Sequence, residues 1–437
     1  MSPDPASPST AAARQRIAVV GGGISGLTAA WLLGLRHDVT VFEAEPRLGG
    51  HTFTVDVPEG NLTRAIDTGF IVFNDLTYPN FRRILRLLGV GSKPTTMSFS
   101  MHCERTRLEY NGGNLDQIFA QRSNLLSPGF WGMLRDIVRF HDRAHLALQG
   151  SGDPTIGEFA REHRLGRRFV EHYLVPMGAA IWSSEPEAVL AMPARFFVQF
   201  FSNHGMLQVT DRPQWYVVEG GSRSYVQKFA ALLGSRVRTA TPVRSVQRDA
   251  AGVTLTTGDG RTERFDAVVL ATHSDTSLRM LADPTAAERA VLGAIPYQEN
   301  EAVLHTDTRL LPDRRRAWAA WNYRIPQQAR SRVAVTYCMN LLQGIDGPVT
   351  YNVTLNQSDA VDPAKVLRRI TWHHPIYSRE GVAAQARLHE VSGVNRTHYA
   401  GAWTRYGFHE DGVMSGLRVA QDFGLSLDDA ERALAKG

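Results

Sequence analysis

The sequence predicts a mixed α/β (α+β) fold, and three observations support this prediction. An apolar run rich in β-branched residues, a glycine turn, a helical stretch and a second strand follow one another over 16–44. Residues 76–200 have mostly helical spacing, whereas 295–390 alternate in places between apolar and polar residues, as strands do. With 437 residues, the chain is long enough for two or three structural units around a large core.

Composition and charge exclude several classes of protein. The two cysteines, Cys103 and Cys338, predict neither a disulfide framework nor a cysteine metal site, and a cytoplasmic location is the default expectation. Residues 1–15 predict a disordered tail without a secretory signal, and no apolar run of about 18 residues predicts a membrane span. A formal net charge of +5 is too small an excess to indicate nucleic-acid binding. Arginine clusters at 81–88, 161–169 and 313–318 are interpreted as solvated surface, with peripheral contact to an anionic membrane as the alternative.

The first strand–helix junction carries the spacing Gly21-x-Gly23-x-x-Gly26. In such a motif the first glycine permits a tight turn, the second lets the backbone approach a pyrophosphate, and the third lets helix and strand pack closely. The helix start offers free N–H groups to phosphate, and Glu43 ends the second strand, where a carboxylate accepts hydrogen bonds from ribose hydroxyls. Strand, glycines, helix and acid together predict a Rossmann-like dinucleotide site.

The remaining elements follow in order along the chain. Short strands are expected in 53–57 and 65–74, and helices through 76–200. The helix expected within 125–148 is amphipathic, which favours an ordinary core helix, with a lipid surface or the mouth of an apolar tunnel as alternatives. A further helix is expected in 220–234 and short strands in 237–272. A sheet is expected in 295–390, and a last strand followed by a helix in 397–423.

The segment after Glu43, "EAEPRLGGHT", resembles the E-x-x-x-R-x-G-G extension of the flavin amine oxidase superfamily. The resemblance implies FAD as cofactor, with Arg47, Gly49 and Gly50 along the pyrophosphate and the flavin. It also implies a backbone contact to adenine at Val243. A fixed cation offsets phosphate charge, and glycine permits close approach to a flat ring.

Three longer stretches, 66–81, 179–226 and 399–416, look like bacterial predicted NAD/FAD-binding amine-oxidase-like proteins. They are also similar to the N-terminal region of plant cyclopropane fatty acid synthases and to methylated fatty acid desaturases of furan fatty acid synthesis. This resemblance implies a link to lipids and a possible partner lipid methyltransferase. One departure stands out: Gly401 is followed by Ala402, where many relatives have an acidic residue.

Together these features predict a Rossmann-like FAD-binding domain of the amine oxidase type with an inserted mixed sheet/helical substrate domain. The FAD-binding domain is expected to combine 16–75, 218–290 and 392–430. The substrate domain is expected to combine 76–217 and 291–391.

The predicted function is FAD-dependent oxidation, in which a methyl-branched or unsaturated fatty acyl chain of a phospholipid loses a hydride to flavin N5. The alternatives are an amine oxidase, a carotenoid-type desaturase, and a flavin-binding accessory protein to a lipid methyltransferase. An amine oxidase needs an aromatic cage or an acidic anchor, and the aromatic candidates are Trp182, Trp215, Tyr216, Trp403 and Tyr406.

The segment "GFHEDGVMSG" (407–416) joins the last predicted strand to a helix. Asp411 is expected as its N-cap, with Gly412 allowing close approach and free N–H groups of Val413 and Met414 facing the flavin. Candidate bases are His409 and Glu410, with His204 and Tyr78 interpreted as structural, and no metal site is expected. The positions assigned to FAD binding are Gly21, Gly23, Ile24, Ser25, Gly26, Glu43, Ala44, Arg47, Gly49, Gly50, His51, Thr52, Thr68, Gly69, Phe70, Val243, Ala271, Thr272, Gly401, Ala402, Gly412, Val413 and Met414.

Overall fold

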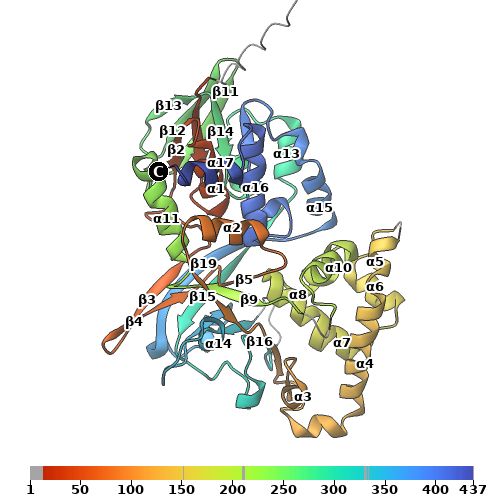
Figure 1. Ribbon diagram of the computed structural model, residues 1–437. Coiled ribbons are helices and arrows are strands. Elements are labelled where there is room, and N and C mark those ends of the chain that lie inside the picture. The colour runs from red at the N-terminus through yellow and green to blue at the C-terminus, as the bar shows by residue number, and fades with distance from the viewer. Residues whose placement is uncertain (1–12, 151, 209–211, 329–331, 333, 437) are drawn as a thin grey trace, which may run out of the picture.

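Two large β-sheets organise the structure, one in the upper and one in the lower half of Figure 1. The computed structural model describes residues 13–150, 152–208, 212–328, 332 and 334–436. The predicted tail over 1–15 lies mostly outside these residues. No helix in the described part of the chain is both long and apolar enough to cross a bilayer.

The upper sheet is parallel and has the strand order β10-β2-β1-β14-β20. Its central strand β1 is the predicted apolar run, and Ile17, Ala18 and Val19 in it are fully buried. Burial on both faces is what a parallel sheet requires. The bounds are β1 Arg16–Val20, β2 Asp38–Phe42, β10 Val237–Arg238, β14 Ala267–Leu270 and β20 Thr397–Tyr399.

Alternate side chains of β1 enter two different cores, because successive residues of a strand point to opposite faces. Ile17 and Val19 pack against α1 Ile24–Leu33, α11 Arg223–Leu233, α16 His409–Asp422 and α17 Leu427–Leu434. Ala18 and Val20 pack against a second, antiparallel sheet and nearby helices. These elements are β11 Val243–Asp249, β12 Gly252–Thr257, β13 Thr262–Phe265, α12 Ser274–Met280, α13 Ala286–Leu292 and α15 Arg379–Ala386.

The lower sheet has seven strands in the order β19-β15-β18-β17-β16-β7-β8, and only β16 and β7 pair in parallel. Most of it comes from the stretch in which the sequence predicted a sheet. The bounds are β7 Phe99–Cys103, β8 Leu108–Asn111, β15 Tyr297–His305, β16 Trp321–Ile325, β17 Val335–Cys338, β18 Asn352–Leu355 and β19 Val366–Pro375.

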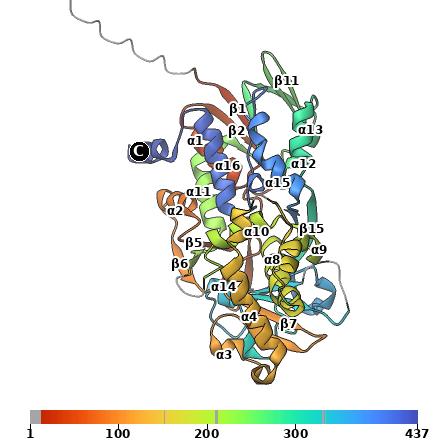
Figure 2. The ribbon, with the colours of Figure 1, turned by 90° about the vertical axis from the view of Figure 1, so that its right-hand side faces the viewer.

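A group of helices shares an aromatic core with this sheet. It lies to the right in Figure 1 and faces the viewer in Figure 2. The longest is α4, in which Phe130, Met133 and Phe140 are buried, so the predicted amphipathic helix has one core face. The bounds are α3 Leu115–Ile118, α4 Pro128–Arg143, α5 Leu146–Gln149, α6 Ile156–Glu162, α7 Arg167–Phe169, α8 Val175–Trp182, α9 Pro186–Ala191 and α10 Ala194–Asn203.

Smaller elements join the two halves. They are the hairpin β3 Thr54–Glu59 and β4 Leu62–Asp67, the small sheet of β5 Val72–Asn74, β9 Trp215–Val218 and β6 Ser92–Thr95, and the helices α2 Pro79–Leu87 and α14 Met339–Gln343. The expectation that 76–200 is mostly helical is wrong over 92–111, where β6, β7 and β8 form. The reason is long-range pairing: β7 adds to β16, more than 200 residues later in the chain.

The proposed FAD-binding segments contribute all the strands of the upper sheet, and both proposed substrate segments contribute to the lower one. The domain boundaries themselves stay a prediction. Cys103 and Cys338 are both free and buried.

Candidate active site

The glycine loop between β1 and α1 has the geometry of a phosphate cradle. Gly21 has a φ of +110°, which an L side chain rarely adopts. A Cβ on Gly26 would lie 1.9 Å from the Gly21 carbonyl oxygen, so helix and strand pack as closely as predicted. A Cβ on Gly23, the N-cap of α1, would meet nothing within 4 Å, and no side chain caps this helix. The free N–H groups at the start of α1 therefore face open space, which fits a pyrophosphate.

Glu43 holds the glycine loop from the end of β2. Its two carboxylate oxygens accept the Gly22 N–H (2.7 Å) and the Glu45 N–H (2.8 Å). Glu43 is buried, whereas the neighbouring Ala44 is exposed. The ribose contact assigned to Glu43 stays a prediction.

The second glycine pair folds against the first loop. The Gly49 N–H donates to the Gly22 carbonyl (2.8 Å), and Arg47 donates to the carbonyls of Gly50 (3.0 Å) and Thr52 (3.2 Å). Arg47 thus braces this loop. His51 follows, stacked on Trp372 with ring centroids 4.8 Å apart, and its buried Nε2 has no hydrogen-bond partner. Burial drives the pKa of His51 well below its usual value, so the ring is neutral. An unpartnered nitrogen beside this loop also fits a bound cofactor.

Thr68, Gly69 and Phe70 approach the same loop from the end of β4. The Thr68 hydroxyl donates to the Phe53 carbonyl (2.8 Å), and a Cβ on Gly69 would lie 2.0 Å from the His51 carbonyl oxygen. The small residue therefore permits a close approach between two backbone segments. Phe70 stacks on His409 at 3.6 Å between ring centroids.

The other predicted contacts lie along the carboxyl ends of the parallel strands, with one exception. A Cβ on Gly21 would lie 2.6 Å from the Ala271 carbonyl oxygen, which places the end of β14 beside the glycine loop. Thr272 bonds to Ser277 (2.8 Å). The remaining positions are Gly401 and Ala402, which follow shortly after β20, and Val243, which begins β11. Val243 comes two residues after Thr241, whose N–H donates to the Glu43 carbonyl (2.8 Å).

The helix α16 begins earlier than expected. Its N-cap is Phe408, and Asp411 is the third helical residue, accepting the Phe408 N–H at 3.0 Å. The Gly412 N–H already bonds to the Phe408 carbonyl (3.1 Å), so the free N–H groups belong to 409–411. The expectations that Asp411 is the N-cap and that Val413 and Met414 present free N–H groups are therefore wrong.

Gly412 and Gly416 form the contact between α16 and α1. A Cβ on Gly412 would lie 2.7 Å from Ile24 Cγ2, and one on Gly416 would lie 2.5 Å from the Ser25 carbonyl oxygen. The close approach expected at Gly412 is thus made to the start of α1. The contact sets the N-terminal part of α16 beside the phosphate cradle.

His409 belongs to a buried hydrogen-bond chain. Its Nε2 bonds to the Tyr225 hydroxyl (2.8 Å), which bonds in turn to the Thr52 hydroxyl. Burial lowers the pKa of His409 to about 3, so this imidazole is neutral. Tyr225 was not among the residues predicted from the sequence, because its partner His409 lies 184 residues away. A catalytic role for His409 stays a prediction.

Glu410 caps a different helix. Its carboxylate accepts the Asn80 N–H (3.0 Å), the Asn80 side-chain N–H (2.7 Å) and the Phe81 N–H (2.9 Å) at the start of α2. Burial raises the pKa of Glu410, while these donors act in the opposite direction. The contacts favour a structural role, and a role as base stays a prediction.

The two other candidate bases, His204 and Tyr78, and the neighbouring Asp411 are also ionisable. His204 bonds through Nδ1 to the Phe200 carbonyl (2.9 Å), and burial lowers its pKa to about 4. Burial raises the pKa of Tyr78 above its usual range, so its hydroxyl stays protonated. Burial also raises the pKa of Asp411 to about 7, although its Oδ1 lies 3.6 Å from Arg405 Nε.

An aromatic cluster lies before the start of α16. Phe200 contacts Trp182 (4.9 Å), Phe408 (4.6 Å) and Tyr406 (5.8 Å between ring centroids). Trp182 also donates to the Tyr406 carbonyl (3.1 Å). Of the aromatic candidates from the sequence, Trp182 and Tyr406 belong here, whereas Trp215 and Tyr216 lie on β9 and Trp403 packs in the core beside β14. The additional members are Phe196, Phe200, Tyr377 and Phe408.

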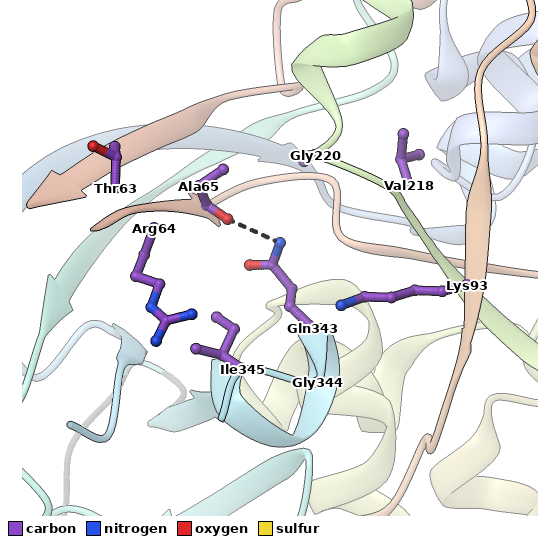
Figure 3. Close-up of a pocket in the computed structure, with 10 residues that line it drawn as sticks. Thr63, Arg64, Ala65, Lys93, Val218, Gly220, Gln343, Gly344 and Ile345 are labelled. Carbon is purple, nitrogen blue, oxygen red and sulfur yellow. Dashed lines mark hydrogen bonds between the residues drawn. The ribbon is translucent and has the colours of Figure 1, made fainter. Parts of the chain in front are cut away.

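Two recesses in the described structure differ in their relation to the predicted site. One of about 340 Å³ includes Arg47, Thr52 and Phe53 in its wall, and so adjoins the predicted cofactor loop. The other, of about 200 Å³, contains none of the predicted site residues. Figure 3 shows Lys93 and Arg64 entering it from opposite sides of Gln343.

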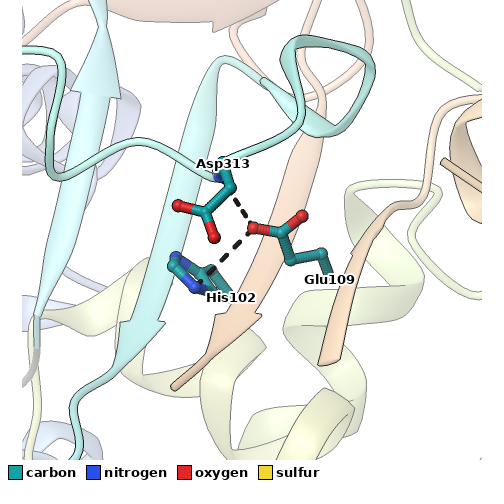
Figure 4. Close-up of side chains that lie close together, drawn as sticks. All are labelled: His102, Glu109 and Asp313. Atoms are coloured by element: carbon teal, nitrogen blue, oxygen red, sulfur yellow. Dashed lines mark hydrogen bonds and ion pairs between the residues drawn. The ribbon is translucent and has the colours of Figure 1, made fainter. Parts of the chain in front are cut away.

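Among the described residues, His102, Glu109 and Asp313 are the only group of potential metal ligands with atoms within 4.8 Å of one another (Figure 4). Glu109 is already engaged, because it accepts the Asp313 N–H and pairs with Arg314, both at 2.7 Å. His102 Nε2 lies 3.6 Å from the same carboxylate. An internal ion pair accounts for this group without a cation.

Comparisons with known proteins identify chains that are similar in sequence. The carotenoid phi-ring synthase of Streptomyces griseus is 31% identical over 294 residues, which are 61% of this chain and 54% of that protein. The chain spans about half the length of the curated relatives it matches.

Solved structures share the fold. A CLA-producing fatty acid isomerase from P. acnes superposes with a TM-score of 0.69 at 16% identity, covering 94% of this chain and 98% of that one. The cyclohexylamine oxidase of Brevibacterium oxydans IH-35A gives 0.66 at 16% identity, with 94% and 100% covered. The family described as flavin containing amine oxidoreductase matches residues 24–332, more than half of the chain. With a glycine cradle that fits a pyrophosphate, the chain therefore belongs to this family of FAD-dependent oxidoreductases, and its cofactor is FAD.

Proposed function

We propose that the protein dehydrogenates an apolar substrate, a methyl-branched or unsaturated fatty acyl chain of a phospholipid. The observation that carries the proposal is the aromatic cluster before α16, to which Trp182, Phe200, Tyr406 and Phe408 belong. Where a substrate contacts such side chains, they favour an apolar chain over a charged group, because a charge loses its hydration there. A structural neighbour that is named as a fatty acid isomerase supports the proposal. The relative that is named as a carotenoid phi-ring synthase favours the carotenoid alternative instead.

The carboxylates of Glu410 and Asp411 also favour an apolar substrate over an amine. Glu410 is engaged with three N–H donors of α2, and Asp411 with the Phe408 N–H and Arg405. An amine oxidase that anchors an ammonium group needs a carboxylate that is available to the substrate. Neither of these two carboxylates meets that requirement without giving up its own contacts.

The residues of this chain would hold the cofactor and shape the reaction space. The start of α1 and Gly23 would hold the pyrophosphate, and the free N–H groups of 409–411 are suited to stabilise negative charge on a ring. FAD supplies the hydride-accepting chemistry. The aromatic side chains would shield the reacting carbon from water and align the acyl chain. The proton that the substrate loses would pass to a base or to a water molecule at the edge of this space.

The test is anaerobic mixing of the oxidised FAD-loaded protein with a methylated phospholipid, an amine or a carotenoid, in separate reactions. We expect the flavin absorbance to bleach with the phospholipid. Tyr406→Leu should keep this rate within about threefold, whereas Tyr406→Asp should lower it at least about tenfold, because it places a charge among the aromatic side chains.

Bleaching by an amine but not by the lipid would instead support amine oxidation, which the family description favours. The third proposal is an accessory role beside a lipid methyltransferase. Steady turnover of any of these substrates by the purified protein with an electron acceptor would count against it.

A further inference from the structure

Four large apolar side chains project into solvent at one end of the molecule. The exposed fractions are 76% for Leu115, 47% for Leu125, 87% for Leu126 and 50% for Trp131. These four residues, here called the leucine tip, come from α3, the 3₁₀ turn Arg122–Leu126 and the start of α4. Figures 1 and 2 both place α3 and this end of α4 at the opposite end of the molecule from the parallel sheet.

The leucine tip is held in place by its own contacts. The Trp131 indole N–H donates to the Leu125 carbonyl (3.0 Å), and the Trp131 ring packs on the buried Phe119 at 5.3 Å between centroids. Ser127 caps α4 by accepting the Phe130 N–H (3.3 Å). The leucines are therefore displayed by an ordered scaffold, and ordered apolar groups in water at one place mark an interaction surface.

Arginines surround the leucine tip. Asp116 pairs with both Arg122 and Arg316, so one negative charge faces two positive charges. Arg135 lies one turn after Trp131 on α4, with a side chain that is 72% exposed. It shares Asp136 with Arg139, at 3.9 Å and 2.9 Å, so here too one negative charge faces two positive charges. Arg315 follows on the turn that packs against α3, with its guanidinium 5.0 Å from the Trp318 ring centroid. The surface thus combines exposed apolar groups with an excess of positive charge.

We propose that the leucine tip docks on an anionic lipid surface, with the leucines in the headgroup–acyl boundary and the arginines against the headgroups. Apolar side chains ringed by cations complement that interface, in which hydrocarbon lies beneath negative charge. Two copies meeting at this surface would bring the same arginines together, which repels. The proposal deepens the proposed function and rests on it for the reason to visit a membrane, namely a phospholipid substrate.

The test measures co-sedimentation of the full FAD-loaded chain with phosphatidylcholine vesicles, with and without phosphatidylglycerol. Leu115→Ser with Leu126→Ser removes the two most exposed leucines of the tip. Leu76→Ser with Leu232→Ser is the matched control, because these leucines are 58% and 42% exposed elsewhere. Circular dichroism and flavin absorbance confirm that each variant is folded.

We expect binding to vesicles that contain phosphatidylglycerol, weakened by salt, and a fall of at least about tenfold in the tip variant with the control unchanged. Arg315→Gln with Arg316→Gln should remove most of the difference between the two vesicle types. Equal binding by the tip variant and the wild type would overturn the proposal. So would a wild-type dimer without lipid that becomes a monomer in the tip variant, because the tip would then join two copies.

This assay requires no turnover, so its result is independent of the reaction. A protein that binds vesicles while its flavin is not bleached by lipid supports the docking surface and refutes the proposed substrate. A protein whose flavin is bleached by detergent-dispersed lipid but which binds no vesicles refutes the docking surface alone.

Discussion

Replacing Glu410 by glutamine separates its two candidate roles, as a base and as a helix cap. The carboxylate accepts two N–H groups of Asn80 through one oxygen and the Phe81 N–H through the other. In Glu410→Gln one oxygen remains, and an NH₂ group faces one of these donors. One hydrogen bond is lost and a buried donor is left unpaired, which costs about 1–3 kcal/mol. Glu410→Ala loses all three bonds and should cost more.

The chemistry should respond differently. If Glu410 only caps α2, flavin reduction by the active substrate should stay within about threefold in Glu410→Gln, whereas loss of a general base lowers the rate by about 10²–10⁴. Urea unfolding gives the free energy, and anaerobic rapid mixing gives the rate of bleaching. Unchanged stability together with a hundredfold slower reduction would refute the capping role and support the predicted base.

Three further predictions follow from the geometry. Gly23→Ala should weaken FAD binding at least about tenfold, because the added Cβ enters the space proposed for the pyrophosphate. The unfolding free energy of the apoprotein should change by less than about 1 kcal/mol, because this Cβ meets no protein atom. Equal FAD affinity, measured by flavin fluorescence titration, would place the pyrophosphate elsewhere. The folded pKa of Asp411 is raised to about 7, so its stabilising effect is complete below about pH 4 and is lost as the pH rises through 7. Asp411→Asn should therefore gain stability relative to the wild type between pH 5 and pH 8, by at most about 3 kcal/mol, and an equal difference at both pH values in urea unfolding would contradict this. Arg248→Met should cost about 3–5 kcal/mol, because it removes the cation from the buried Glu288 carboxylate, which keeps only the Tyr399 hydroxyl and the Thr285 N–H as donors. Adding Glu288→Gln, which removes the charge and keeps an acceptor oxygen, should recover part of the loss in the same unfolding assay; no recovery would mean that the unpaired charge is not the cause.

The first βαβ unit could be predicted from the sequence because its signals are local. A buried apolar strand, three spaced glycines and a helix lie within 16–33, and the structure keeps that order. The strands β6–β8 could not be predicted in the same way, since β7 depends on pairing with β16. The roles of Glu410 and Tyr225 were also hidden, because each bonds to a residue far away in the chain.

The N-cap of α16 could not be located from the sequence. Asp411 has the composition of an N-cap, yet it accepts the Phe408 N–H from the third helical position. Asp and Glu are suited to both places, since each can satisfy N–H groups of a first turn. Only the backbone geometry distinguishes the two, and with it the set of N–H groups that are free.

The contact of Gly412 and Gly416 with α1 has a consequence for how the protein is made. All ten residues of α1 are buried in the finished fold, and much of their cover is α16, from the last part of the described chain. During synthesis, α1 therefore keeps an uncovered apolar surface until α16 has emerged from the ribosome. Such exposed intermediates aggregate readily, and long-range closure slows folding. The start of α1, which forms the phosphate cradle, is therefore covered by α16 only late in synthesis.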